Sequence, residues 1–158
     1  MQYVYYFGIW EPDLTGWISR RIHSGDTFVD VGANVGYYSL LASTLVGQSG
    51  SVVAIEPSPR LFQALRDSVA RNRLRNVRSV NLAVLDRSTM VSLFRGTEYH
   101  SGLTTTREER GLEFECRVET APLPAILSPE ETRGARLVKV DVEGAEWEVP
   151  PAFLALAV

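Results

Sequence analysis

The chain has 158 residues, of which 45% are hydrophobic, and a net charge of −3. This is enough for one domain with an apolar core, and the negative balance gives no electrostatic case for nucleic acid. The single cysteine, Cys116, excludes an internal disulfide and a cysteine-based metal cluster. No stretch predicts a membrane span, and the N-terminus lacks the basic region of a signal peptide. We therefore expect a soluble, cytoplasmic protein without nucleic acid or membrane as partner.

Hydrophobic periodicity predicts alternating strands and helices along most of the chain. In chain order we expect a helix within 11–22, a turn at 23–26, a strand at 27–30, a helix at 38–45, a strand at 51–55, a helix at 61–70, a strand at 77–84, paired strands at 90–94 and 114–118, a short helix at 123–127, and a strand at 136–141. Strands alternating with helices and then an excursion by a hairpin favour a doubly wound α/β sheet.

The turn after the first strand is rich in glycine and leads directly into a helix. Strand, tight turn and helix is the order in which an open parallel sheet builds a nucleotide pocket. Gly32 lets the backbone approach a ligand, and the free N–H groups at the helix start are expected to face an anion. A dinucleotide fingerprint needs glycine where this chain has Asn34 and Tyr37, which disfavours NAD and FAD.

A carboxylate follows the second strand, at the position where an acid can accept hydrogen bonds from a ribose diol. That residue is Glu56. Asp30, the glycine turn and Glu56 together indicate an adenosine ligand without a pyrophosphate. S-adenosylmethionine fits this description.

Three blocks of the chain carry a family resemblance. They are Asp30–Tyr38 (DVGANVGYY), Ala54–Pro59 (AIEPSP) and Val138–Glu146 (VKVDVEGAE). In this order they resemble the FkbM-type, S-adenosylmethionine-dependent methyltransferases of class I, over roughly residues 8–149. The resemblance implies a Rossmann-like, mostly parallel sheet. It also implies O-methylation of a hydroxyl group on a sugar or secondary metabolite, so a small hydroxyl acceptor is the expected partner.

The residues expected to bind the cofactor lie near the ends of the first three strands or just after them. They are Asp30, Gly32, Ala33, Asn34, Gly36, Glu56, Asn81 and Ala83. Several of them have a simpler alternative. The glycines also suit a purely structural turn, and Glu56 could be a surface acid. Asp30 could accept backbone N–H bonds, and Asn81 could cap a turn.

The last block places further polar residues at the carboxyl end of a strand, where open α/β sheets hold reacting groups. Asp141 is the first candidate to receive a proton from the substrate hydroxyl, and His100 is the second. Lys139 and Glu143 are candidates for substrate binding, although Lys139 could be a buried residue paired with an acid and Glu143 could begin a helix. The two histidines show no metal-ligand spacing, so no metal is expected. His100 lies in a long connection, 95–111, which we expect to cover the site.

We expect one domain over 1–158, with a helical lead-in at 1–26, a cofactor-binding core at 27–149 and a divergent tail at 150–158. Pro150 and Pro151 disfavour a helix in the tail. The tail cannot supply the family's later strands, so the sequence predicts a C-terminally truncated member with an exposed edge strand, which could dimerise. The alternatives are a non-catalytic cofactor-binding remnant or interaction domain, and a nicotinamide-dependent oxidoreductase.

Overall fold

A computed structural model describes residues 6, 8–96, 104–106 and 111–142. Its centre is a parallel sheet in the order β3-β2-β1-β8. These strands span Thr27–Val31 (β1), Ser51–Ile55 (β2), Val77–Val80 (β3) and Ala135–Val140 (β8). Among the described strands, β8 lies at the edge of this sheet. The predicted α/β class and the parallel central sheet are therefore confirmed.

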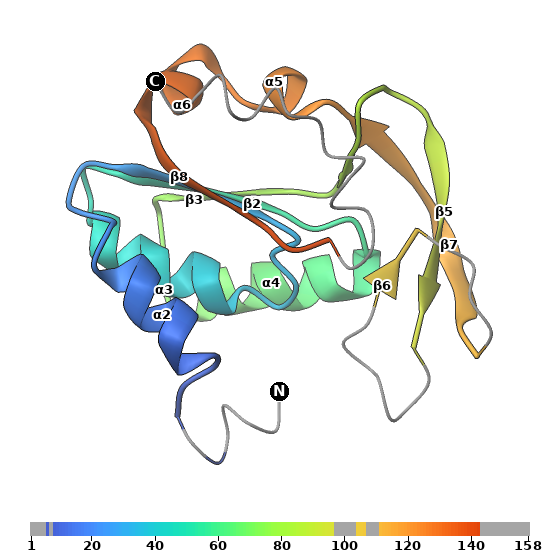
Figure 1. Cartoon of the computed structure of the whole chain (residues 1–158), viewed down its shortest axis with the longest axis horizontal. Coiled ribbons are helices and arrows are strands. Elements are labelled where there is room, and N and C mark those ends of the chain that lie inside the picture. Colours follow the sequence, from blue (N-terminus) through green and yellow to red (C-terminus); the bar gives the residue numbers. More distant parts are fainter. Residues whose placement is uncertain (1–5, 7, 97–103, 107–110, 143–158) are drawn as a thin grey trace.

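Helices cover both faces of the central sheet (Figure 1). On one side lie α2 (Pro12–Ser19), α3 (Tyr37–Val46) and α4 (Pro59–Arg71); on the other lie the short α5 (Leu123–Ile126) and α6 (Pro129–Gly134). All five residues of β1 are buried, because both faces of this strand are covered. None of the described helices is long and apolar enough to cross a membrane.

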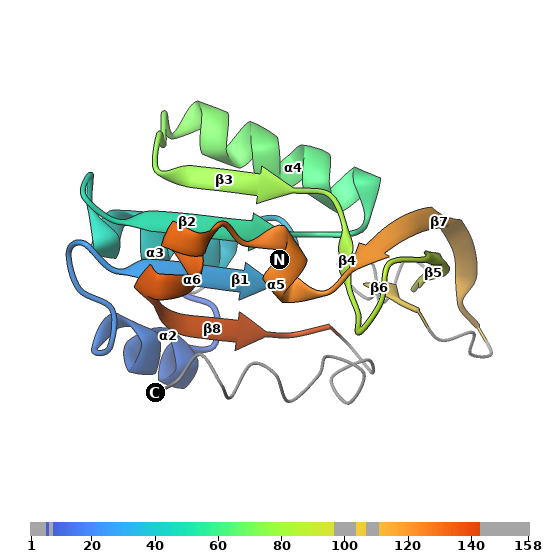
Figure 2. The same ribbon diagram turned by 90° about the horizontal axis from the view of Figure 1, so that it is seen from above.

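A second four-stranded sheet lies beyond the carboxyl ends of β1, β2 and β3 (Figure 2). Its order is β4-β7-β5-β6, and its strands span Ala83–Val84 (β4), Met90–Arg95 (β5), Thr104–Thr105 (β6) and Glu113–Ala121 (β7). The predicted pairing of the strands at 90–94 and 114–118 is confirmed, since β5 and β7 are antiparallel neighbours. The second sheet therefore forms a wall at the carboxyl ends of the central strands, which is the end at which parallel α/β folds bind ligands.

Three details differ from the sequence-based prediction. The strand expected at 77–84 is broken into β3 and β4, which belong to different sheets. The side-chain amide of Asn81 donates to the carbonyl oxygens of Glu56 and Pro57, at 2.8 Å each, and holds the chain as it turns away from β3. The predicted connection at 95–111 contains β6. The helix α6 was missed because it has no apolar stripe; its signal is the capping box formed by Ser128 and Glu131.

Gly32 lies where the end of β8 passes closest to the turn after β1. Its φ is +77°, and a Cβ there would overlap with the backbone carbonyl oxygen of Asp141. The Asp141 N–H donates to the Val31 carbonyl oxygen at 3.0 Å, which fixes the two strand ends against each other. Only glycine fits both the backbone angle and the close approach.

Replacing Gly32 by alanine should therefore destabilise the fold more than backbone strain alone would. Gly111→Ala is the matched control, because Gly111 has a φ of +93° and, among the described residues, no atom lies within 4 Å of an added Cβ. We expect Gly111→Ala to lower the free energy of unfolding by about 1–2 kcal/mol, and Gly32→Ala to lower it by about 3 kcal/mol or more. Urea denaturation of both variants measures the difference. Equal losses would show that Asp141 does not crowd Gly32.

Candidate cofactor and catalytic site

A pocket opens at the carboxyl ends of β1, β2 and β8, facing the second sheet. The turn and strand ends contribute Gly32, Asn34, Glu56 and Asp141 to its lining. The opposite wall is mostly apolar and includes Leu82, Ala83, Leu85, Leu93 and Thr106. The pocket is thus polar where the central strands end and apolar where the second sheet closes over it.

The turn after β1 uses its own N–H groups within the protein. Gly32 and Ala33 both donate to the Ile55 carbonyl oxygen at 3.0 Å, and Gly36 donates to that of Ala33 at 2.9 Å. The Val35 N–H bonds to the side-chain oxygen of Asn34, whose φ is +53°. The N–H groups of residues 32–36 are therefore used within the protein, because the turn folds back on β2. The expectation that the N–H groups at the helix start face an anion concerns α3, from Tyr37 on, and stays a prediction.

Glu56 holds this turn in place. Its Oε2 accepts the N–H of Asn34 at 2.8 Å, and its Oε1 accepts the N–H of Ser58, just before α4, at 2.9 Å. The residue is only 4% exposed, so the alternative of a surface acid is excluded. Each carboxylate oxygen has a second lone pair, so Glu56 can accept further hydrogen bonds from a ligand in the pocket.

Burial is the main cause of an unusual pKa at Glu56. Desolvation, reinforced by the nearby charges of Asp30 and Glu115, raises this pKa from the usual 4.5 to about 7. The two backbone hydrogen bonds act in the opposite direction but do not compensate. The carboxyl group therefore changes its charge near neutral pH.

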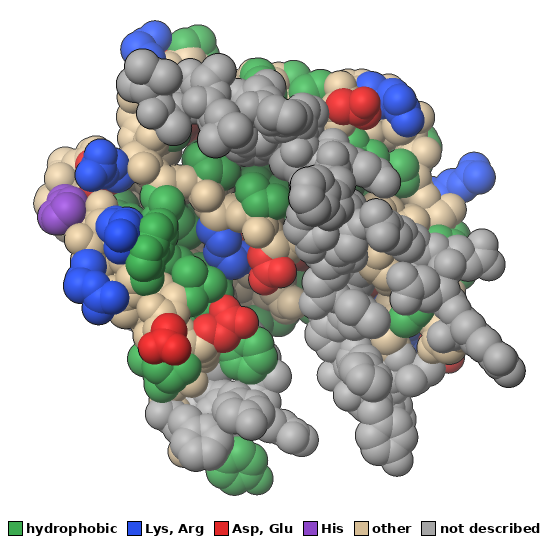
Figure 3. All heavy atoms as spheres, viewed as in Figure 1, with side chains coloured by type: hydrophobic (Ala, Val, Ile, Leu, Met, Phe, Trp, Pro, Cys, Tyr) green, Lys and Arg blue, Asp and Glu red, His purple; other side chains and the backbone are tan. Residues whose placement is uncertain are grey.

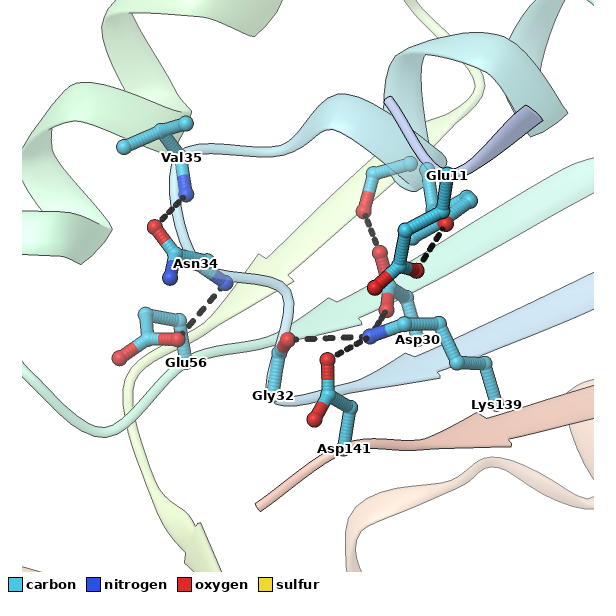
Figure 4. Close-up of polar contacts among 10 residues, drawn as sticks. Glu11, Asp30, Gly32, Asn34, Val35, Glu56, Lys139 and Asp141 are labelled. Atoms are coloured by element: carbon cyan, nitrogen blue, oxygen red, sulfur yellow. Dashed lines mark hydrogen bonds and ion pairs between the residues drawn. The ribbon is translucent and has the colours of Figure 1, made fainter. Parts of the chain in front are cut away.

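Behind the turn lies a buried ion pair between neighbouring strands (Figure 4). Asp30 on β1 and Lys139 on β8 are register partners, and Lys139 Nζ donates to Asp30 Oδ1 at 3.1 Å. The other Asp30 oxygen accepts a hydrogen bond from the Ser39 hydroxyl at 2.6 Å. Lys139 Nζ also lies 5.3 Å from the ring centroid of Tyr38, whose hydroxyl donates to Glu11. Burial and the bond to Glu11 raise the pKa of Tyr38, which keeps this phenol neutral.

Asp141 connects this buried pair to the pocket. Its side chain is 59% exposed, and its Oδ2 lies 3.6 Å from Lys139 Nζ. Figure 3 shows an acidic and a basic side chain next to each other near the middle of this face. A carboxylate that lines the pocket and remains accessible can accept a proton from a bound hydroxyl compound.

The charge of the pocket tests whether S-adenosylmethionine fits. Among the described lining residues, Glu56 and Asp141 are the ionisable ones, and both are acidic. Asp141 and the ionised form of Glu56 would repel a pyrophosphate, whereas a ligand with a sulfonium and an ammonium group meets no cation in this lining. The residues present therefore fit S-adenosylmethionine better than NAD or FAD.

The predicted site residues fall into three groups. Gly32, Asn34, Glu56, Ala83 and Asp141 line the pocket together. Asp30, Ala33, Gly36, Asn81 and Lys139 lie behind it and support the turn or the strand ends. His100 and Glu143 lie outside the described residues, as does the tail at 150–158.

For Lys139 the structure shows the simpler alternative, since it pairs with the buried Asp30. Asp30 also has a structural role, but it bonds to the side chains of Lys139 and Ser39 rather than to backbone N–H groups. Asn81 donates to two backbone carbonyl oxygens where the chain leaves β3. The lining residues Leu93 and Thr106 were not predicted. The length of the connection at 95–111 was the only indication in the sequence for Thr106. Leu93 lies before that connection, in β5.

Comparison of the sequence with models of known protein families identifies the family. The methyltransferase FkbM domain matches residues 30–149, which include the turn, Glu56 and β8. The chain belongs to the FkbM methyltransferase family. S-adenosylmethionine, the cofactor expected from the sequence, fits this family.

Shorter similarities link the FkbM domain to other methyltransferases. A probable cobalt-precorrin-6B C(15)-methyltransferase (decarboxylating) of Sulfolobus acidocaldarius is 39% identical over 36% of this chain and 30% of its own length. The arsenite methyltransferase of Halobacterium salinarum is 34% identical over 34% of this chain and 14% of its own. The matches thus span less than a third of either relative. A SAM-dependent methyltransferase structure from Aquifex aeolicus shares 27% identity, with a TM-score of 0.40 over 45% of this chain and 37% of that chain.

The raised pKa of Glu56 predicts a pH-dependent stability. Between pH 4.5 and about 7 the folded protein keeps a proton that the unfolded chain has released, so stability falls as pH rises. The loss is at most about 3 kcal/mol, at about 1.36 kcal/mol per pKa unit. Glu56→Gln removes this titration and serves as the reference. Urea denaturation at several pH values should show the stability advantage of the wild type over Glu56→Gln shrinking as pH rises. A constant difference would show that the pKa of Glu56 is not raised.

Proposed function

We propose that the pocket binds S-adenosylmethionine and that the protein methylates a hydroxyl oxygen of a small molecule, such as a sugar or secondary metabolite. The proposal rests above all on the acidic lining of the pocket by Glu56 and Asp141, beside the glycine turn of β1. The FkbM family match supports the reaction class. The choice of a hydroxyl acceptor rests on Asp141 and on the family resemblance.

The pocket residues divide between the two ends of the cofactor in this proposal. Glu56 accepts hydrogen bonds from the ribose hydroxyls, through the lone pairs that the backbone N–H groups leave open. Gly32 and Asn34 lie against the methionine end, and Ala83 against the adenine. When bound, S-adenosylmethionine supplies an electrophilic methyl group.

Asp141 has the second role, as the group that takes the proton from the acceptor hydroxyl. Its carboxylate is both accessible and part of the pocket. The apolar wall that includes Leu82 and Leu93 would exclude water from the same space. In-line methyl transfer needs little more than a positioned acceptor, a proton acceptor and a dry site, since good positioning alone can lower the barrier by about 7–11 kcal/mol.

Isothermal titration tests cofactor binding. We expect the wild type to bind S-adenosylhomocysteine with micromolar affinity and NAD not at all. Glu56→Gln should weaken S-adenosylhomocysteine binding by about ten- to a hundredfold, because a hydrogen bond to a charged group is worth roughly 1.5–3 kcal/mol.

The matched control for Glu56→Gln is Glu115→Gln. This substitution makes the same change of charge near α4. Glu115 accepts a hydrogen bond from the Ser58 hydroxyl but does not line the pocket. Because the charge of Glu115 raises the pKa of Glu56, this variant leaves Glu56 at least as ionised as in the wild type, and it should bind S-adenosylhomocysteine at least as tightly. Unchanged affinity in Glu56→Gln, or equal losses in both variants, would remove Glu56 from the cofactor site.

A screen of hydroxyl acceptors tests the role of Asp141. With an acceptor found, Asp141→Asn should lower the methylation rate by about 10²–10⁴-fold, the usual contribution of a general base. Its affinity for S-adenosylhomocysteine should change less than about tenfold. A rate close to that of the wild type would exclude Asp141 as the proton acceptor. Binding of S-adenosylhomocysteine without methylation of any acceptor would favour the non-catalytic alternative.

A further inference from the structure

Lys139 is a cation that contacts the pocket residues from behind. Its side chain is 10% exposed, and it does not line the pocket. Besides Asp30, its Nζ donates to the Gly32 carbonyl oxygen at 3.2 Å and lies 3.6 Å from Asp141 Oδ2. An ammonium group has three protons, and the three oxygens around it come from three different places in the fold.

The position of this ammonium is set by the sheet. Lys139 and Asp30 face each other in register on adjacent parallel strands, and the Ser39 hydroxyl of α3 fixes the far oxygen of Asp30. The buried pair therefore cannot shift without moving a strand or α3. The other two oxygens belong to Gly32, in the turn, and to Asp141, at the end of β8, and both residues line the pocket.

We infer that Lys139 is a positioning residue, whose buried ammonium fixes the Gly32 turn and the Asp141 carboxylate relative to each other. The inference rests on the proposed function, because it gives the role of a residue that supports the same pocket. Lys139 then serves cofactor binding and the proton acceptor at once, without touching the ligand. A purely structural ion pair would stabilise the sheet and leave the affinity of the pocket unchanged.

A double variant separates these roles. Lys139→Met alone leaves Asp30 buried without its partner, which is strongly destabilising. Removing both charges in Asp30→Asn/Lys139→Met is far milder, because no unpaired buried charge remains and the introduced amide oxygen can still accept the Ser39 hydrogen bond. The double variant should therefore recover most of the lost stability, but it no longer holds Gly32 and Asp141.

The readout is S-adenosylhomocysteine affinity at matched stability, measured by titration and urea denaturation. We expect the Asp30→Asn/Lys139→Met variant to bind at least about tenfold more weakly than the wild type. Lys139→Arg keeps the charge, but a planar guanidinium cannot reproduce the three contacts of an ammonium. It should also bind more weakly, and it supplies the test if the double variant does not fold.

The matched control is a second ion pair, between Arg78 on β3 and Glu131 on α6, with oxygen–nitrogen distances of 2.6 and 2.7 Å. Neither residue lines the pocket. The Arg78→Met/Glu131→Gln variant should therefore bind S-adenosylhomocysteine with the affinity of the wild type. Affinity within about twofold of the wild type in both the double variant and Lys139→Arg would overturn the inference. A folded wild type that does not bind S-adenosylhomocysteine would instead overturn the proposed function.

Discussion

The buried ion pair between Asp30 and Lys139 is the interaction on which the arrangement of the site depends. It joins β1 to β8, and through Ser39 it also fixes α3. A buried pair of this kind adds little net stability, because desolvation offsets most of the attraction. Its effect is geometric: the same ammonium reaches the Gly32 carbonyl and the Asp141 carboxylate, so the turn and the end of β8 keep one relative position.

Glu56 imposes the second constraint, from the other side of the turn. Its carboxylate accepts one hydrogen bond from the Asn34 N–H, in the turn between β1 and α3, and one from the Ser58 N–H, just before α4. One buried side chain after β2 therefore holds both this turn and the start of α4. The cost of this burial appears as the raised pKa of Glu56. The turn thus lies between two buried charged groups, Lys139 and Glu56, while its own N–H groups are satisfied. A phosphate would therefore find none of the N–H groups of residues 32–36 free.

The sequence predicted much of the central sheet and five of the residues that line the pocket, because these follow from local patterns. Strand periodicity located β1, β2 and β8, and an acid or glycine at a strand's carboxyl end is recognisable from its position alone. The partners of these residues are not local. That Lys139 pairs with Asp30 depends on β8 lying next to β1, 109 positions away in the chain. Two further features depend on the second sheet: the end of β3 at Asn81 and the presence of Thr106 in the pocket lining. Local patterns do not show where the strands of that sheet lie relative to the central sheet.

The most direct test of this account is a crystal structure of the protein with S-adenosylhomocysteine. We expect the ligand in the pocket between the central strands and the second sheet, with its ribose hydroxyls on the Glu56 carboxylate and its amino acid end beside Gly32. Lys139 should keep its contacts with Asp30 and Gly32. Ligand bound elsewhere on the protein, or a ribose that does not contact Glu56, would contradict the central claim that the ends of β1, β2 and β8 form the cofactor site.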